Sequence, residues 1–143
     1  MLYSKIIVAY DGSEHSEKAL ESAIKLAEMN HSAKLEVIYV YVDPFQKMVL
    51  GGEGLLLIPS DLQNEMASAI VEKAKKAVEG LPYANVIFKE GHPAKIILEY
   101  TESEGGDLIV VGSRGLGAIG EFVLGSVSHN IVQHTKVPVL VVK

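Results

Sequence analysis

The sequence has little of several features that would place it in a specialised class. Its 143 residues include no cysteine, and aromatic residues make up only 6%. Without cysteine there can be neither disulfides nor a thiolate site, so packing alone must hold the fold, as in a reducing compartment, and we expect a cytoplasmic protein. With so few aromatic rings, aliphatic side chains must supply nearly all of the core, which favours packed strands and helices over a stacking surface.

Positive charge and long apolar runs are also scarce. The formal net charge is −5, which opposes binding to phosphate backbones and anionic lipids. No apolar run approaches the roughly 20 residues that span a bilayer. The first such run, Ile6 to Tyr10, is short and ends on Asp11 without a small-residue cleavage pattern, so it predicts a strand rather than a signal peptide. We therefore expect no nucleic-acid or membrane partner.

Strand-like and helix-like segments alternate along the whole chain. The length suits one domain, which we expect to cover residues 1–143. Such alternation predicts an α/β fold, an open parallel five-stranded sheet with helices on both faces. The predicted strands are 5–10, 35–42, 85–90, 107–112 and 137–142, and the predicted helices are 14–30, 60–79, 93–103 and 126–134.

Local signals mark several of these boundaries. Ser13 is a suitable N-cap, with acidic residues following in the first turn, and Ser60 with Gln63 forms a capping box. Between Pro44 and Pro59 the pattern lapses, and we interpret the segment as a surface loop. Its apolar residues 55–58 offer an alternative, that the loop covers a ligand or a partner.

A Gly-rich segment runs from Gly112 to Ser126. It reads Gly112-Ser-Arg-Gly115, then nine residues, then Gly125-Ser126 at a predicted helix start. Glycines let backbone N–H groups approach an anion closely, and a helix start adds free N–H groups and a positive dipole end. The segment predicts a site for the phosphates of a nucleotide. The alternative is that the glycines form a flexible loop or let helix and sheet pack closely.

Two better-known phosphate motifs do not explain this segment. The chain has no Gly-Lys-Ser/Thr, so it is not a Walker-type P-loop. Gly115-Leu-Gly117-Ala-Ile-Gly120 matches the dinucleotide fingerprint, but it follows the fourth predicted strand and lacks an acidic residue about 20 positions on. We interpret that match as accidental.

With these residues in view, the chain resembles the ATP-binding branch of the universal stress protein family over essentially its whole length. The family pattern Gly-x2-Gly-x9-Gly-Ser/Thr is matched by Gly112, Gly115, Gly125 and Ser126. Further matches are Ile-Val-Ala-Tyr-Asp-Gly-Ser at 7–13, the turn 91–93, Asp-Leu-Ile-Val-Val-Gly at 107–112 and Val-Pro-Val at 137–139. The resemblance implies a Rossmann-like sheet with strand order 3-2-1-4-5.

The resemblance also implies a binding site for ATP, with ADP or AMP as alternatives, accompanied by Mg²⁺ or Mn²⁺. Asp11 would contact the ribose and adenine end, although the same carboxylate can bind a metal or cap its turn. Val40 would flank the adenine, and Gly125 with Ser126 would grip the outer phosphates. The implied nucleotide contacts are Ala9, Tyr10, Asp11, Gly12, Ser13, Val40, Gly112, Ser113, Arg114, Gly115, Gly125, Ser126 and Val127.

Three functions remain open at this point. The first is a nucleotide-dependent regulatory or stress-response protein, a homodimer through the last strand, Val137 to Val142. The second is a slow ATPase or phosphotransfer enzyme, for which Arg114 is the nearby strong cation and Glu121 the one candidate base within the Gly-rich segment; we name no catalytic residue. The third is a dimeric interaction module with a vestigial pocket. His129 and His134 lack the spacing of a helical zinc site, and His15 near Asp11 and Ser13 does not by itself make a hydrolase triad.

Overall fold

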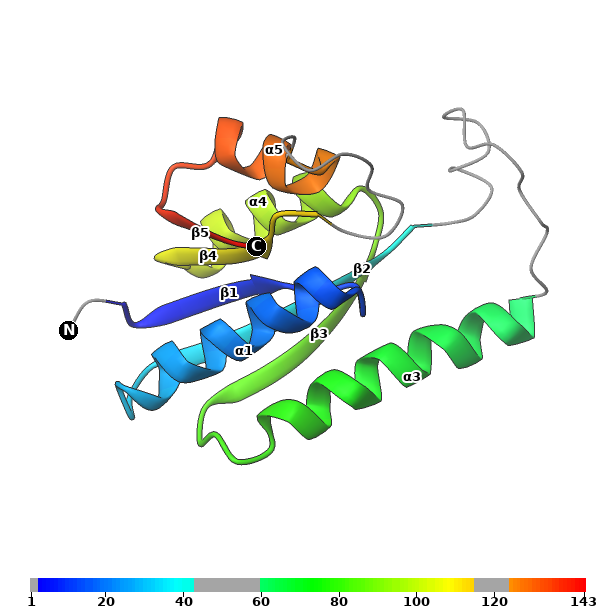
Figure 1. Ribbon diagram of the computed structural model, residues 1–143, viewed down its shortest axis with the longest axis horizontal. Coiled ribbons are helices and arrows are strands. Elements are labelled where there is room, and N and C mark those ends of the chain that lie inside the picture. Colours follow the sequence, from blue (N-terminus) through cyan, green and yellow to red (C-terminus); the bar gives the residue numbers. More distant parts are fainter. Residues whose placement is uncertain (1–2, 43–59, 115–123) are drawn as a thin grey trace.

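The computed structural model describes residues 3–42, 60–114 and 124–143, with the backbone alone at 60–63. Strands and helices alternate along the chain (Figure 1). In chain order they are β1 (Lys5–Ala9), α1 (Glu14–Glu28), β2 (Lys34–Tyr41), α3 (Ser60–Val78), β3 (Ala84–Glu90), α4 (Pro93–Glu104), β4 (Leu108–Gly112), α5 (Ser126–His134) and β5 (Val139–Val142).

The five strands form one parallel sheet in the order β3-β2-β1-β4-β5, which confirms the predicted fold class and strand order. The chain first winds outward from β1 to β2 and β3, then returns to β4 and β5 on the other side of β1. The winding direction therefore reverses between β1 and β4. In open α/β sheets, ligands bind outside the carboxyl ends of the strands at such a switch point.

The central strands β1 and β4 are buried on both faces, which explains their runs of aliphatic residues. Successive side chains point to opposite faces. On one face Ile6 and Val8 of β1 pack in a cluster with α1 and α3, and on the other face Ile7 and Ala9 pack in a cluster with α4 and α5 (Figure 1). Helices thus cover both faces of the sheet, as predicted.

Helix ends follow the local signals. The Ser13 side chain accepts the N–H of Ser16 at 3.3 Å, so the predicted N-cap of α1 is confirmed. Pro93 opens α4, and Gly105 ends it in the left-handed conformation with φ of 72°. The capping-box side chains of α3 lie outside the described residues, although the helix does begin at Ser60.

The last strand is shorter than predicted, since it begins at Val139 rather than Val137. The Val137 N–H is bonded at 3.0 Å to the side chain of Thr135, and Pro138 has no N–H to give to the sheet. The Pro138 carbonyl still accepts the N–H of Ile109 at 3.0 Å. The predicted loop from Pro44 to Pro59 lies outside the described residues, so its role stays a prediction.

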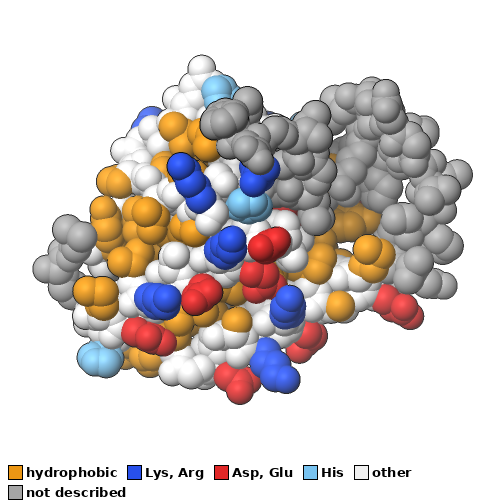
Figure 2. All heavy atoms as spheres, viewed as in Figure 1, with side chains coloured by type: hydrophobic (Ala, Val, Ile, Leu, Met, Phe, Trp, Pro, Cys, Tyr) orange, Lys and Arg blue, Asp and Glu red, His pale blue; other side chains and the backbone are white. Residues whose placement is uncertain are grey.

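The outer surface of α1 and α3 mixes charges of both signs (Figure 2). Several of them pair within a helix, as Lys18 with Glu14 at 3.7 Å and Lys25 with Glu21 at 3.4 Å, and Lys73 of α3 reaches Glu17 of α1 at 2.9 Å. Among the described helices, none combines the length and the apolar character needed to cross a bilayer.

Candidate functional site

Three segments meet at the carboxyl ends of β1 and β4, where the winding of the sheet reverses. They are the turn from β1 to α1, the residues that follow β4, and the start of α5 (Figure 1). Each contains residues that the sequence assigned to a nucleotide site. The fold therefore brings together segments more than 100 positions apart in the chain.

The turn from β1 to α1 is held by its own polar groups. Asp11 accepts the backbone N–H of Ser13 on Oδ1 at 2.9 Å, which is the turn-capping role foreseen as one alternative for this carboxylate. Gly12 has a φ of 83°, a conformation that L side chains rarely adopt. The Ser16 hydroxyl donates to the Ser13 carbonyl at 2.9 Å.

Gly112, the last residue of β4, lies directly against the first turn of α1. A Cβ atom at this position would be 2.7 Å from the backbone carbon of His15 and 2.8 Å from its oxygen. The glycine is therefore required for the close approach of strand and helix. Close packing of helix and sheet was the predicted alternative to phosphate binding for these glycines. A packing role at Gly112 is compatible with a phosphate-binding role.

Ser113 joins the three segments. Its N–H donates to the Val142 carbonyl at 2.7 Å, and its carbonyl accepts the Gly125 N–H at 2.8 Å and the Ser128 hydroxyl at 2.9 Å. Its Oγ lies 3.4 Å from Nδ1 of His15 on α1. One residue thus fixes the end of β4 to β5, to the start of α5 and to the start of α1.

The start of α5 faces this junction with its positive dipole end. Gly125 is the N-cap, and its N–H is already used by Ser113, so the donors available to an anion are those of the first turn, residues 126–128. Ser126 is exposed and Val127 partly buried. The first turn therefore offers backbone donors and a hydroxyl in the way that helix starts bind anions.

Residues predicted near the adenine end lie deeper. Ala9 and Val40 are buried in the cluster beneath α4 and α5, at 8% and 6% exposure. Tyr10 is 2% exposed and belongs to the cluster on the other face, where its hydroxyl donates to Glu17. Burial, together with this bond to a carboxylate, raises the pKa of Tyr10. Its ring is thus engaged in the core, and its backbone is the part nearest the turn.

Most of the predicted site residues fall at this one end of the sheet, and some contacts were not predicted. Arg114 follows Ser113 and is partly buried. Gly115 lies outside the described residues, so its role stays a prediction. The contacts of Ser113 with His15 and Ser128 were not predicted, because the spacing of residues in the chain carries no signal for them.

No metal-binding cluster of three or more His, Asp or Glu side chains is present in the ranges 3–42, 60–114 and 124–143. His129 and His134 are both exposed on α5, and Nδ1 of His134 lies 3.0 Å from the carbonyl of Asn130.

Fold and site together define an open α/β protein whose Gly- and Ser-rich segments meet at its topological switch point. The sequence model of the Universal stress protein family matches residues 2–143. The chain belongs to the universal stress protein family.

Individual relatives agree with this assignment. The universal stress protein YxiE of Bacillus subtilis is 37% identical over 150 aligned residues, which cover 99% of this chain and 100% of that protein. The solved structure of MJ0577, a universal stress protein of Methanocaldococcus jannaschii, has a TM-score of 0.79 at 28% identity and covers 100% of this chain and 97% of its own. A universal stress protein solved in complex with cAMP has a TM-score of 0.71 at 26% identity, with 99% and 98% covered.

Proposed function

We propose that the protein binds ATP with Mg²⁺ or Mn²⁺ in the crevice between β1 and β4 and acts as a nucleotide-dependent regulatory protein in a stress response. The observation that carries the proposal is the junction at Ser113. It holds the start of α1, the end of β4 and the start of α5 at one switch point through contacts of 2.8 to 3.4 Å. The relative solved with cAMP supports an adenine nucleotide as the ligand class.

The roles within the site follow from the position of each segment. Asp11 would contact the ribose, and the backbone at Gly112 would lie along the ribose and phosphates. Ser126 and the N–H groups of the first turn of α5 would hold the outer phosphates, with Arg114 supplying charge. Hydrogen bonds to charged groups contribute about 1.5 to 3 kcal/mol each, so several are enough for the roughly 8 kcal/mol of micromolar binding before ordering costs are subtracted.

A homodimer through β5 is part of the proposal. This strand is an edge of the sheet, and its Leu140 side chain is 40% exposed. An apolar edge strand is open to pairing with another chain, and a second copy of the strand would cover it. The absence of cysteine supports a cytoplasmic location.

The test is calorimetric titration of nucleotide-free protein with ATP, ADP and AMP in the presence of Mg²⁺. We expect micromolar binding of ATP that is lost in Gly115→Val, because a β-branched side chain would crowd the glycine motif. Gly80→Ala, at the far end of the sheet, is the matched glycine control and should bind as the wild type does. Phosphate release in the same samples, compared with Arg114→Ala, measures any slow hydrolysis.

Failure of every nucleotide to bind folded, nucleotide-free protein would contradict the proposal and favour the interaction module. Steady phosphate release that disappears in Arg114→Ala would instead favour the enzyme.

A further inference from the structure

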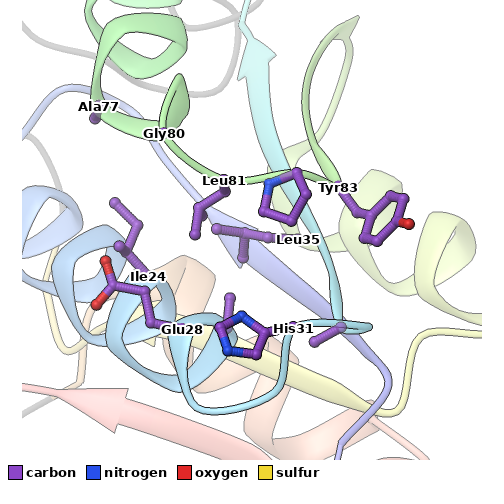
Figure 3. Close-up of a pocket in the computed structure, with 11 residues that line it drawn as sticks. Ile24, Glu28, His31, Leu35, Ala77, Gly80, Leu81 and Tyr83 are labelled. Atoms are coloured by element: carbon purple, nitrogen blue, oxygen red, sulfur yellow. The ribbon is translucent and has the colours of Figure 1, made fainter.

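A cavity of about 220 Å³ lies near the amino ends of β2 and β3, away from the proposed nucleotide site at the carboxyl ends of β1 and β4. It is bounded by the end of α1, the start of β2 and the segment that connects α3 to β3 (Figure 3). Its deepest lining residues are Ala27, Ala33 and Leu35, at 5%, 5% and 0% exposure. This base is wholly aliphatic.

The walls and rim differ in chemistry from the base. Ile24 and Leu81 add apolar surface, and Figure 3 shows both beside Leu35. Glu28 and His31, both exposed, stand along one side. In the part of the chain that the structure describes, neither of them is engaged in a hydrogen bond or ion pair. The cavity therefore combines an apolar interior with an unpaired carboxylate at its edge.

Two helix ends add to the negative potential. Helix α1 ends at Glu28 and α3 at Val78, so the negative dipole ends of both helices lie at this cavity. Lysines in the last turns partly offset this field: Lys25 and Lys75 are themselves paired with carboxylates at 3.4 and 3.6 Å, whereas Lys76 also lies in the last turn of α3. The residues that line the cavity include the carboxylate of Glu28 and no lysine or arginine, so the lining itself favours a cation over an anion.

The walls are held by backbone bonds and need no ligand to form. The Leu35 N–H donates to the Tyr83 carbonyl at 2.9 Å, the Ala33 N–H to the Asn30 carbonyl at 2.9 Å, and the Leu81 N–H to a carbonyl at the end of α3 at 3.0 Å. A site that is already formed loses little affinity to ordering on binding.

We propose that this cavity binds a small organic ammonium ion, with a compact apolar body seated on Leu35 and its neighbours and the ammonium group at Glu28. The volume is below the 300 Å³ or so typical of sites for drug-sized ligands, so the body is limited to a short alkyl chain or one ring. The site is separate from the nucleotide crevice, and its occupancy requires no nucleotide.

The test is a titration of the ¹⁵N-labelled full chain with hexylammonium, followed by amide chemical shifts. Hexanoate and 1-hexanol carry the same alkyl chain with the opposite charge or none, and they serve as matched probes. We expect hexylammonium to produce saturable shifts confined to residues 24–35 and 77–83. Hexanoate should give none at the same concentration, and hexanol should bind more weakly than the ammonium ion.

Variants separate the two parts of the proposed site. Glu28→Gln should lower the affinity for hexylammonium about three- to tenfold, because it removes the charged partner at the rim. Glu99→Gln on α4, across the sheet, removes the same charge from an exposed carboxylate and should leave the affinity unchanged. Ala77 lines the cavity, so the larger side chain in Ala77→Phe should fill it and abolish hexylammonium binding. Gly80→Leu is a second filling variant, because Gly80 also lines the cavity and a Cβ there meets nothing within 4 Å.

The proposal is overturned if the folded protein shows no saturable shift with hexylammonium, or if hexanoate shifts the same residues equally. It is also overturned if shifts arise away from the cavity or survive in a folded filling variant. Each of these results is independent of ATP binding, so the two proposals fail separately.

Discussion

The close approach of Gly112 to α1 can be tested by adding a single methyl group. In Gly112→Ala the new Cβ would lie 2.7 Å from the backbone carbon of His15, where an ordinary contact needs at least 3.4 Å. The obstacle is backbone and not a flexible side chain, so the first turn of α1 must retreat by about 0.7 Å. Overpacking of this kind costs about 1 to 3 kcal/mol of the free energy of unfolding.

Urea denaturation followed by circular dichroism measures this cost, with Gly80→Ala as the control. A Cβ at Gly80 meets nothing within 4 Å, so that variant should stay within about 0.5 kcal/mol of the wild type. Because the turn at Asp11 leads directly into α1, we also expect Gly112→Ala to lower the affinity for ATP at the proposed site. If Gly112→Ala is as stable as the wild type, Gly112 is not required for the packing of β4 against α1.

Three further predictions concern polar groups. Hydrogen bonds from the N–H groups of Ser4 and Lys5 outweigh the effect of burial and lower the pKa of Asp107, so its contribution to stability is present above about pH 4 and is lost as the pH falls through the lowered pKa. Asp107→Asn should therefore be less stable than the wild type at pH 7, and in pH-resolved urea unfolding the difference should disappear as the pH falls below the lowered pKa of Asp107; parallel curves would disprove this. Lys5→Met leaves Glu36, whose side chain is 9% exposed, without the ion pair at 3.0 Å, and should cost about 3 kcal/mol in urea at pH 7, whereas a loss under about 0.5 kcal/mol would show the pair to be dispensable. Ser13→Ala removes the N-cap of α1 and should lower the free energy of unfolding by about 1 kcal/mol, and no change in the urea midpoint would argue against the cap.

The fold was predictable because its signals are local and agree with one another. The aliphatic run at Leu108–Val111 and the helix signals at Ser13 and Pro93 each mark an element boundary within a few residues, and alternation of the elements then requires a parallel sheet. The predicted start of the last strand was wrong by two residues. The Val137 N–H bonds to the Thr135 side chain instead of a neighbouring strand, and Pro138 has no N–H. The strand order came from family resemblance and not from any local signal.

The sequence indicated which segments to combine in a candidate site, the turn at Asp11 to Ser13 and the Gly-rich segment from Gly112, but not the contacts between them. Sequence spacing could not show that Ser113 bonds to both His15 and Gly125, because those contacts exist only after helices and strands have packed. The orientation of the Tyr10 side chain could not be predicted either. Its ring is buried in the core and its hydroxyl bonds to Glu17, although its neighbour Asp11 lies in the candidate site.

The most direct test of the nucleotide crevice is a titration of the ¹⁵N-labelled, nucleotide-free protein with ATP and Mg²⁺, followed by amide chemical shifts. We expect the amide signals of residues 10–13, 112–114 and 125–128 to shift together and to saturate with one affinity. The signals of residues 24–35 and 77–83, at the other end of the sheet, should not shift. An absence of shifts in folded protein, or shifts confined to another part of the molecule, would contradict it.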